Sequence, residues 1–197
     1  MRAYFSILSF LLLCCGRSEA QSAYQRYMKT YRSAYTSQHE AVPEADKKYF
    51  RFFPADISYK IHARFEKLND TIGFIMPTTG EKPKKFYRYG IAHFRLGKDS
   101  CRLFIYQSDA LRNSSRYRDH LFIPFTDQTS GEASYGGGRY IDILVTDIRD
   151  DMVVIDFNKS YNPYCAYSSG YNCPIPPREN DLPVAIRAGE KEFAKKH

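Results

Sequence analysis

Two alternating apolar runs, at residues 140–145 and 152–157, restrict the fold more than any other feature of the sequence. Both runs have the length of strands, and side chains along a strand alternate between its two faces. The residues between the runs, 146–151, are polar and rich in aspartate, which is typical of a turn. The sequence therefore predicts a β-hairpin over residues 140–157.

In one register of this hairpin, Asp142 falls directly opposite Asp156, with Cβ atoms about 4.5–5.5 Å apart. Two carboxylates at that separation repel unless an arginine, a cation or a shared proton lies between them. Such a pair would serve acid–base chemistry or metal binding. Alternatively, both acids are solvated or pair with Arg139 and Lys159, and a register slip of one residue separates them altogether.

A glycine-rich segment, YGGGRY at residues 135–140, leads into the first run. Glycines adopt main-chain conformations that other residues resist. Such a segment can hold an anion with its N–H groups, but phosphate loops normally lead from a strand into a helix. A turn or a β-bulge is the alternative. Arg139 is the stronger binding candidate, because a guanidinium can hold a carboxylate or a phosphate with two hydrogen bonds.

The segment 161–177, after the second run, is dense in Tyr, Asn, Ser, Gly and Pro. Its tyrosines offer large amphipathic surfaces, so we expect an ordered loop. Cys165 and Cys173 frame this loop, and a disulfide between them would contribute roughly 2–3 kcal/mol. The alternatives are free thiols or a metal site, for which no further local Cys or His is at hand. We therefore expect a disulfide, no metal and no cofactor, with Cys101 left as a buried thiol.

Longer motifs run through these segments: PFTDQTSG (124–131), YGGGRYID (135–142), DFNKSYNPYCAY (156–167) and CPIPPREN (173–180). Together they resemble the signature of the bacterial family catalogued as domain of unknown function 1684. The resemblance extends back to residues 52–54 and forward to residues 187–190. The resemblance implies a bacterial protein that is often exported. It does not imply any particular activity.

The remaining sequence predicts a mainly β domain at residues 50–197, preceded by a helix and connector at 21–49. Residues 22–38 have large side chains at helical spacing, which gives one face made of Tyr24, Met28, Tyr31 and Tyr35. Strands are expected at 57–68, 72–76, 87–96, 102–107, 120–125, 140–145, 152–157 and 184–188. Strands in this order favour an antiparallel barrel or sandwich of about eight strands with an N-terminal helix.

Residues 1–20 have the pattern of an export signal. The apolar run 4–15 is too short to span a membrane, and Ser-Glu-Ala at 18–20 is a small-x-small cleavage site. Cys14 and Cys15 offer the alternative of a lipid anchor. We expect an exported protein of the periplasm or outer cell envelope, with no transmembrane span in the mature chain.

The formal net charge of +7 permits binding to nucleic acid, but the basic residues are dispersed and form no nucleic-acid motif. Asp119 and His120 resemble a surface pair at a strand edge more than an oriented base. Loops at one end of the sheet would gather the candidate residues, since binding residues concentrate on loops. The ligand-binding candidates are Tyr135, Arg139, Asn158, Tyr161 and Asn162, and the catalytic candidates are Asp127, Asp142 and Asp156.

Three functions follow, in order of preference. The first is binding of a small polar or anionic ligand, such as a sugar, in the cell envelope. The second is a structural or interaction role in the envelope, in which the polar motifs only brace the loops. The third is a hydrolase or isomerase that uses Asp142 and Asp156 with Arg139.

Overall fold

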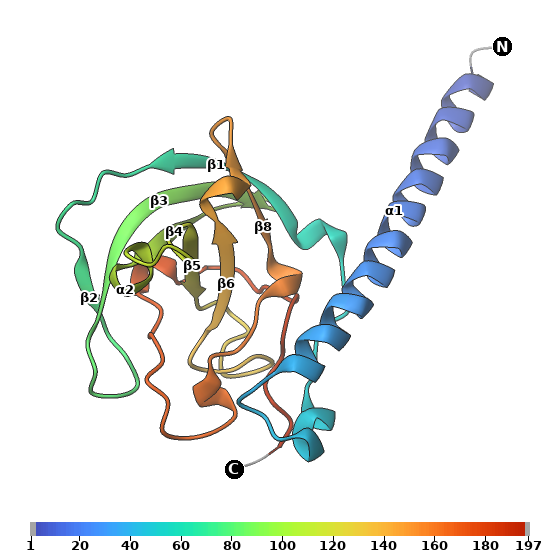
Figure 1. Cartoon of the computed structure of the whole chain (residues 1–197). Helices are drawn as coiled ribbons and strands as arrows, with labels where there is room; N and C mark the ends of the chain where they lie inside the picture. Colours follow the sequence, from blue (N-terminus) through green and yellow to red (C-terminus); the bar gives the residue numbers. More distant parts are fainter. Residues whose placement is uncertain (1–2, 196–197) are drawn as a thin grey trace.

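The computed structural model describes residues 3–195, with side chains from residue 18 onward. A long helix leads into a strongly curved antiparallel β-sheet (Figure 1). The α-helices are α1 (Ala3–Gln38) and α2 (Asp109–Arg112). The strands are β1 (Lys60–Lys67), β2 (Phe74–Met76), β3 (Lys84–Leu96), β4 (Asp99–Ser108), β5 (His120–Phe125), β6 (Arg139–Leu144), β7 (Ile148–Arg149) and β8 (Met152–Asp156). Short 3-10 helices are η1 (Glu44–Tyr49), η2 (Ile57–Tyr59), η3 (Val145–Asp147), η4 (Phe157–Lys159), η5 (Tyr164–Ala166) and η6 (Arg178–Asn180).

The strand order across the sheet is β6-β5-β4-β3-β1-β8-β7, and β2 pairs with β3 outside this path. All the ladders are antiparallel. The expectation of a mainly β, antiparallel fold with an N-terminal helix is confirmed. Because β6 and β7 lie at opposite edges and share no ladder in the described part of the chain, the sheet is not closed into a barrel.

The predicted hairpin over residues 140–157 does not form. Asp142 in β6 lies opposite Phe122 in β5, whereas Asp156 in β8 lies opposite Lys60 in β1. The tight hairpin is β7–β8, whose turn residues Asp150 and Asp151 both have positive φ, at 51° and 57°. Two residues with positive φ match the twist of flanking strands. Because β8 pairs with β7 on one side and with β1 on the other, the Asp142–Asp156 pair that one register would have produced is not made.

The two faces of the sheet pack into different clusters. In β5 and β6, Leu121, Ile123 and Ile141 belong to the main core, which also includes residues from β1, β3, β4 and β8. The intervening Phe122 and Tyr140 belong to a second cluster on the opposite face. This division follows from the alternation of side chains along a strand.

The last predicted strand, at residues 184–188, is instead an extended segment without a ladder. Val184, Ile186 and Ala188 are buried in the main core. Its backbone groups are paired with two buried side chains: Arg139 donates to the carbonyl of Ile186 at 2.9 Å, and Asp127 accepts the N–H of Ile186 at 3.1 Å. The side chains of Arg139 and Asp127 thus make the hydrogen bonds to Ile186 that a neighbouring strand would otherwise make.

The C-terminal half of α1 packs against η1 and η2 and reaches the end of β8 (Figure 1). Tyr24 and Met28 are buried, which confirms the helical face predicted for residues 22–38. The Tyr24 hydroxyl donates to both carboxylate oxygens of Asp156, at 2.7 and 2.8 Å. This hydrogen bond fixes the helix against the end of β8.

The predicted export segment falls on the first part of α1, and the side chains of residues 1–17 lie outside the described part of the structure. Among the residues that are described, no helix combines the length and the apolar character that crossing a membrane requires.

Candidate functional site

A cavity of about 770 Å³ lies on the face of the sheet opposite the main core. Side chains from β3, β5 and β6 form its floor, and α2 and the loop 161–174 form its walls. Ligand-binding pockets typically enclose about 300–1,000 Å³ and are mostly apolar, with a few polar groups that orient the ligand. The volume of this cavity falls within that range.

Asp142 is the centre of the polar groups in the cavity. His120 Nε2 lies 3.0 Å from Asp142 Oδ1, and the Tyr161 hydroxyl donates to Oδ2 at 2.6 Å. The Asp142 side chain remains 42% exposed, so it is still open to a ligand. Burial, and secondly the charge of Asp142, raise the pKa of Tyr161 well above its ordinary value. The tyrosine therefore stays protonated and serves as a donor.

The register of β5 and β6 brings these residues together. Phe122 pairs with Asp142, and His120 lies two positions further along β5 on the same face. Such diagonal neighbours are within reach of each other's side chains. The alternation that sends Ile141 and Ile143 into the main core sends Asp142 into the cavity.

Aromatic rings form the apolar floor of the cavity. Phe122 packs edge-on against Tyr140, with ring centroids 4.7 Å apart, and stacks on Phe86 at 5.7 Å. The Tyr140 hydroxyl donates to the carbonyl of Pro174 in the covering loop. Ring pairs at these separations are stabilising beyond the area that they bury, so the floor is a preformed surface.

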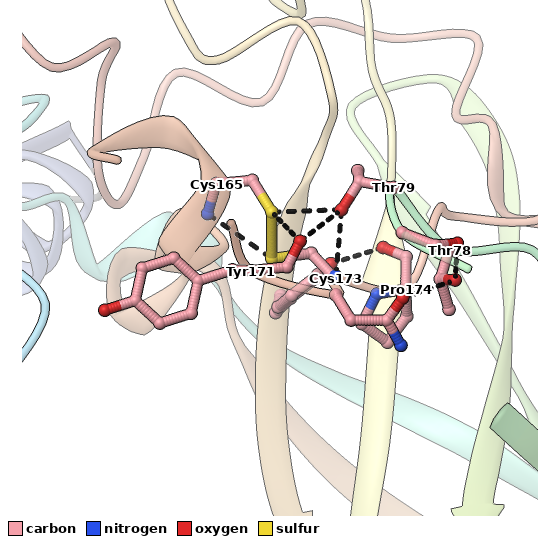
Figure 2. The surroundings of a disulfide bond; sticks show 9 residues. Thr78, Thr79, Cys165, Tyr171, Cys173 and Pro174 are labelled. Carbon is pink, nitrogen blue, oxygen red and sulfur yellow. Dashed lines mark hydrogen bonds between the residues drawn. A yellow bond between two sulfur atoms is a disulfide. The ribbon is translucent and has the colours of Figure 1, made fainter. Parts of the chain in front are cut away.

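The covering loop is held by the Cys165–Cys173 disulfide, which confirms the predicted pair. Figure 2 shows the side chain of Thr79 beside it. The Thr79 hydroxyl accepts a hydrogen bond from the backbone N–H of Cys173 at 3.0 Å. The backbone N–H of Thr79 donates to the carbonyl of Cys173 at 2.9 Å. The loop is thereby fixed to the turn after β2. Cys101 is free and buried, as the sequence predicts.

Arg139 lies outside the cavity, fully buried against Asp127 at 2.7 Å. The glycines before it form a turn, in which the Gly138 N–H donates to the carbonyl of Tyr135 at 3.1 Å. Gly138 has a φ of 85°, and a Cβ atom there would lie 2.6 Å from the carbonyl oxygen of Phe125. Of the two structures considered for the glycine segment, an anion-binding loop and a turn, the segment forms the turn. The N–H of Gly138 bonds within the turn and is not free to hold an anion.

The other predicted residues also make internal contacts. Asn158 bonds both backbone groups of Asp56, at 2.8 and 2.9 Å. The Asn162 side chain donates to the Lys191 carbonyl, and its N–H donates to Glu190 at 3.0 Å. Of the eight ligand-binding and catalytic candidates, the structure brings only Asp142 and Tyr161 to the cavity.

His120, Phe122, Phe86 and Tyr164 line the cavity but were not predicted as site residues. The signal for the first two was present, because His120 and Phe122 alternate with the apolar core residues of β5. This alternation alone does not show that His120 and Phe122 lie beside Asp142, because that requires the pairing of β5 with β6. No group of three or more His, Cys, Asp or Glu residues suited to a metal occurs in the part of the chain that the structure describes.

These features define a small, mainly β protein in which an aromatic cavity with a central carboxylate lies behind a disulfide-held loop. The chain belongs to the family described as "Protein of unknown function (DUF1684)", whose profile matches residues 48–191. This confirms the family resemblance seen in the motifs.

Among solved structures, the chain is similar to the solution NMR structure of an uncharacterized protein of Haloarcula marismortui. The two share 27% sequence identity and a TM-score of 0.64, over 88% of this chain and 96% of the other. None of the curated proteins matches the sequence.

Proposed function

We propose that the protein binds a small molecule with an apolar body and a polar end in the cavity of about 770 Å³. One observation carries this proposal: the Asp142 carboxylate is positioned by His120 and Tyr161 but remains 42% exposed above an aromatic floor. The carboxylate of Asp127, which pairs with Arg139, is by contrast fully buried. The aromatic floor would hold the apolar body, and Asp142 would hold the polar end.

The charges around the cavity restrict the ligand further. A carboxylate accepts hydrogen bonds and repels anions, so the group beside Asp142 is a donor such as a hydroxyl or an amine. Lys84 and Lys85 line another part of the cavity, and burial lowers the pKa of Lys84. An anionic group on the ligand would therefore lie toward the lysines. A hydrogen-bond donor of the ligand would thus lie beside Asp142, and an anionic group, where the ligand has one, would lie near Lys84 and Lys85.

We place this function in the cell envelope, after export through residues 1–20. The Cys165–Cys173 disulfide supports this location, because disulfides persist in oxidising compartments. A lipid anchor at Cys14 or Cys15 remains the alternative to a freely diffusing protein.

The test is a thermal-shift screen of the full chain against sugars, alkyl glycosides, alcohols, carboxylates and phosphates. A ligand at 100 times its Kd stabilises the native state by about 2.7 kcal/mol. The cavity is blocked with Ala110→Trp, because Ala110 is exposed yet lines the cavity. Ser115→Trp is the matched control, in an exposed position outside the lining residues.

We expect a compound that stabilises the wild type and Ser115→Trp but not Ala110→Trp. Equal stabilisation of both variants would place binding elsewhere and refute the proposal. No stabilisation by any class of compound would favour the structural role, in which the motifs only brace the loops.

A further inference from the structure

The cavity has a basic residue as well as the carboxylate of Asp142. Lys84 and Asp142 both line it, one from β3 and the other from β6. Side chains alternate along a strand, so Lys84 lies on the same face of β3 as Phe86, whose ring belongs to the aromatic cluster of the floor. The ammonium group of Lys84 and the carboxylate of Asp142 are therefore two charged ends of one cavity.

The side chain of Lys84 has no counter-ion among the described residues. Lys84 is half-buried, and none of the ion pairs of the structure includes it. Burial lowers the pKa of Lys84, and no neighbouring charge offsets this shift. A charge that is removed from water normally has a partner, because desolvation costs free energy. An anionic group of the ligand would supply this partner.

The other charged groups at this end of the cavity are grouped around Tyr87. The ammonium of Lys85 lies 5.2 Å from the centroid of the Tyr87 ring, and the guanidinium of Arg112 lies 4.2 Å from it. Asp109 accepts a hydrogen bond from the Tyr87 hydroxyl at 2.8 Å. Tyr87 and Lys85 share the face of β3 opposite to that of Lys84. Among the described residues that line the cavity, Lys84 is therefore the cation best placed to pair with a ligand.

The carboxylate of Asp142 can accept more hydrogen bonds than it receives. An ionised carboxylate has about four lone-pair positions for hydrogen bonds. His120 and Tyr161 occupy one position on each oxygen. The remaining positions are suited to a hydroxyl or an amine of the ligand.

The register of the sheet sets the separation of the two ends. One row of paired residues crosses the sheet from β3 to β6: Arg88, Tyr106, Phe122 and Asp142. Three strand spacings amount to about 14 Å, and the four residues from Arg88 to Lys84 amount to about 13 Å. The Cα atoms of Lys84 and Asp142 would thus lie about 20 Å apart on a flat sheet. Their side chains and two hydrogen bonds cover about half of this distance, which leaves roughly 10 Å for the ligand.

We infer that the ligand has two polar ends: a carboxylate that pairs with Lys84, and a hydroxyl or an amine that donates to Asp142. An apolar chain of roughly 10 Å would join them across the aromatic floor. An ω-hydroxy carboxylate of about eight carbons has this form, as judged from the length of a carbon–carbon bond. This inference rests on the proposed function, because the cavity must bind the apolar chain.

The test is isothermal titration of the full chain with four probes: ω-hydroxyoctanoate, octanoate, 1-octanol and ω-hydroxybutanoate. Octanoate lacks the donor, 1-octanol lacks the carboxylate, and ω-hydroxybutanoate is too short to reach both ends. We expect ω-hydroxyoctanoate to bind at least about tenfold more tightly than each of the others, because it alone makes hydrogen bonds to both charged groups.

Lys84→Met keeps an unbranched side chain but removes the ammonium group. It should weaken binding of ω-hydroxyoctanoate about tenfold and leave binding of 1-octanol unchanged. Lys82→Met is the matched control, since Lys82 is exposed, carries the same charge and does not line the cavity. It should bind all four probes as the wild type does.

Equal affinities for ω-hydroxyoctanoate and 1-octanol would overturn the inference and leave the proposed function intact, because the apolar body would still bind. The same conclusion would follow if Lys84→Met and Lys82→Met bound ω-hydroxyoctanoate equally well, or if ω-hydroxybutanoate bound as tightly as ω-hydroxyoctanoate. Failure of all four probes would also overturn the inference, and the proposed function would then depend on the screen with Ala110→Trp.

Discussion

At the scale of single residues, Arg139 organises the C-terminal part of the chain. Its guanidinium donates to Asp127 and to the backbone carbonyls of Ile186, Ala188 and Glu190. A buried arginine with these partners aligns an extended segment that has no neighbouring strand. Its role in the structure is to brace the fold rather than to line the cavity.

Arg139→Ala should reduce the free energy of unfolding by about 3–5 kcal/mol, because it leaves Asp127 as an uncompensated buried charge. Urea denaturation measures this loss. Arg187→Ala, at an exposed position in the same segment, should change stability by less than about 0.5 kcal/mol. Comparable losses in the two variants would show that Arg139 is not a brace.

Glu190 makes stability depend on pH. Burial raises the pKa of Glu190 from 4.5 to about 7, although Asn162, Tyr167 and Tyr35 donate hydrogen bonds to it. The folded state therefore holds a proton that the unfolded chain releases near pH 4.5. The stabilising contribution is complete below about pH 4.5 and is lost as the pH rises through about 7.

As the pH rises from about 4.5 to above 7, ionisation of Glu190 should lower the free energy of unfolding of the wild type by roughly 3 kcal/mol. Glu190→Gln should lack this loss. Urea denaturation at intervals between pH 4.5 and 8 measures both proteins. Parallel stability curves for the wild type and Glu190→Gln would contradict the raised pKa.

Single residues also show what sequence reasoning could achieve at the site. The alternation of β6 correctly separated Asp142 from its apolar neighbours Ile141 and Ile143. It could not identify the partner strand, because register depends on contacts between segments that are distant in the sequence. His120 was therefore interpreted as a surface residue, although it is the partner of Asp142.

At the scale of elements, local patterns predicted most of the strands, and the helix expected at 22–38 ends with α1 at Gln38, although α1 begins at Ala3. The strand expected at 120–125 matches β5 at both ends. The errors concern pairing: the Asp150–Asp151 turn joins β8 to the short β7, and 184–188 has strand-like composition but no ladder. The β7–β8 pairing is local but lies partly within residues 146–151, which were expected to form only a turn. The segment 184–188 instead depends on the distant Arg139 and Asp127, which a single run of residues does not specify.

The helix α1 is attached to the sheet through Tyr24, whose hydroxyl bonds the carboxylate of Asp156. Tyr24→Phe should lower stability by about 1.5–3 kcal/mol, the range for a hydrogen bond to a charged group. Tyr117→Phe makes the same chemical change at a position that is 45% exposed, and should be nearly neutral. Thermal unfolding of both variants gives the comparison, and equal melting temperatures would show that Tyr24 does not anchor α1.

The covering loop links stability to binding. Replacing Cys165 and Cys173 with serine should cost about 2–3 kcal/mol by the chain-entropy model. It should also weaken ligand binding, since Tyr171, Cys173 and Pro174 line the cavity. Calorimetric titration and denaturation of the double variant test both effects. Full affinity in the double variant would mean that the loop lines the cavity without the disulfide.

At the scale of the whole molecule, the curved sheet separates the main core from the cavity. One face packs with the C-terminal segment into the main core, and the opposite face carries the aromatic cluster and the cavity. The braced motif residues Asp127, Arg139 and Asn158 lie away from that cavity and maintain the architecture around it. Side chains that line the cavity can therefore be changed without altering the main core.

The most direct test of cavity binding is a ¹H–¹⁵N NMR titration of the full chain with the most stabilising compound from the screen. We predict that the largest amide shifts fall in β5, β6 and the loop 161–174, around His120, Asp142 and Tyr161. Shifts confined to other parts of the sheet, or the same shifts in Ala110→Trp, would contradict ligand binding in this cavity.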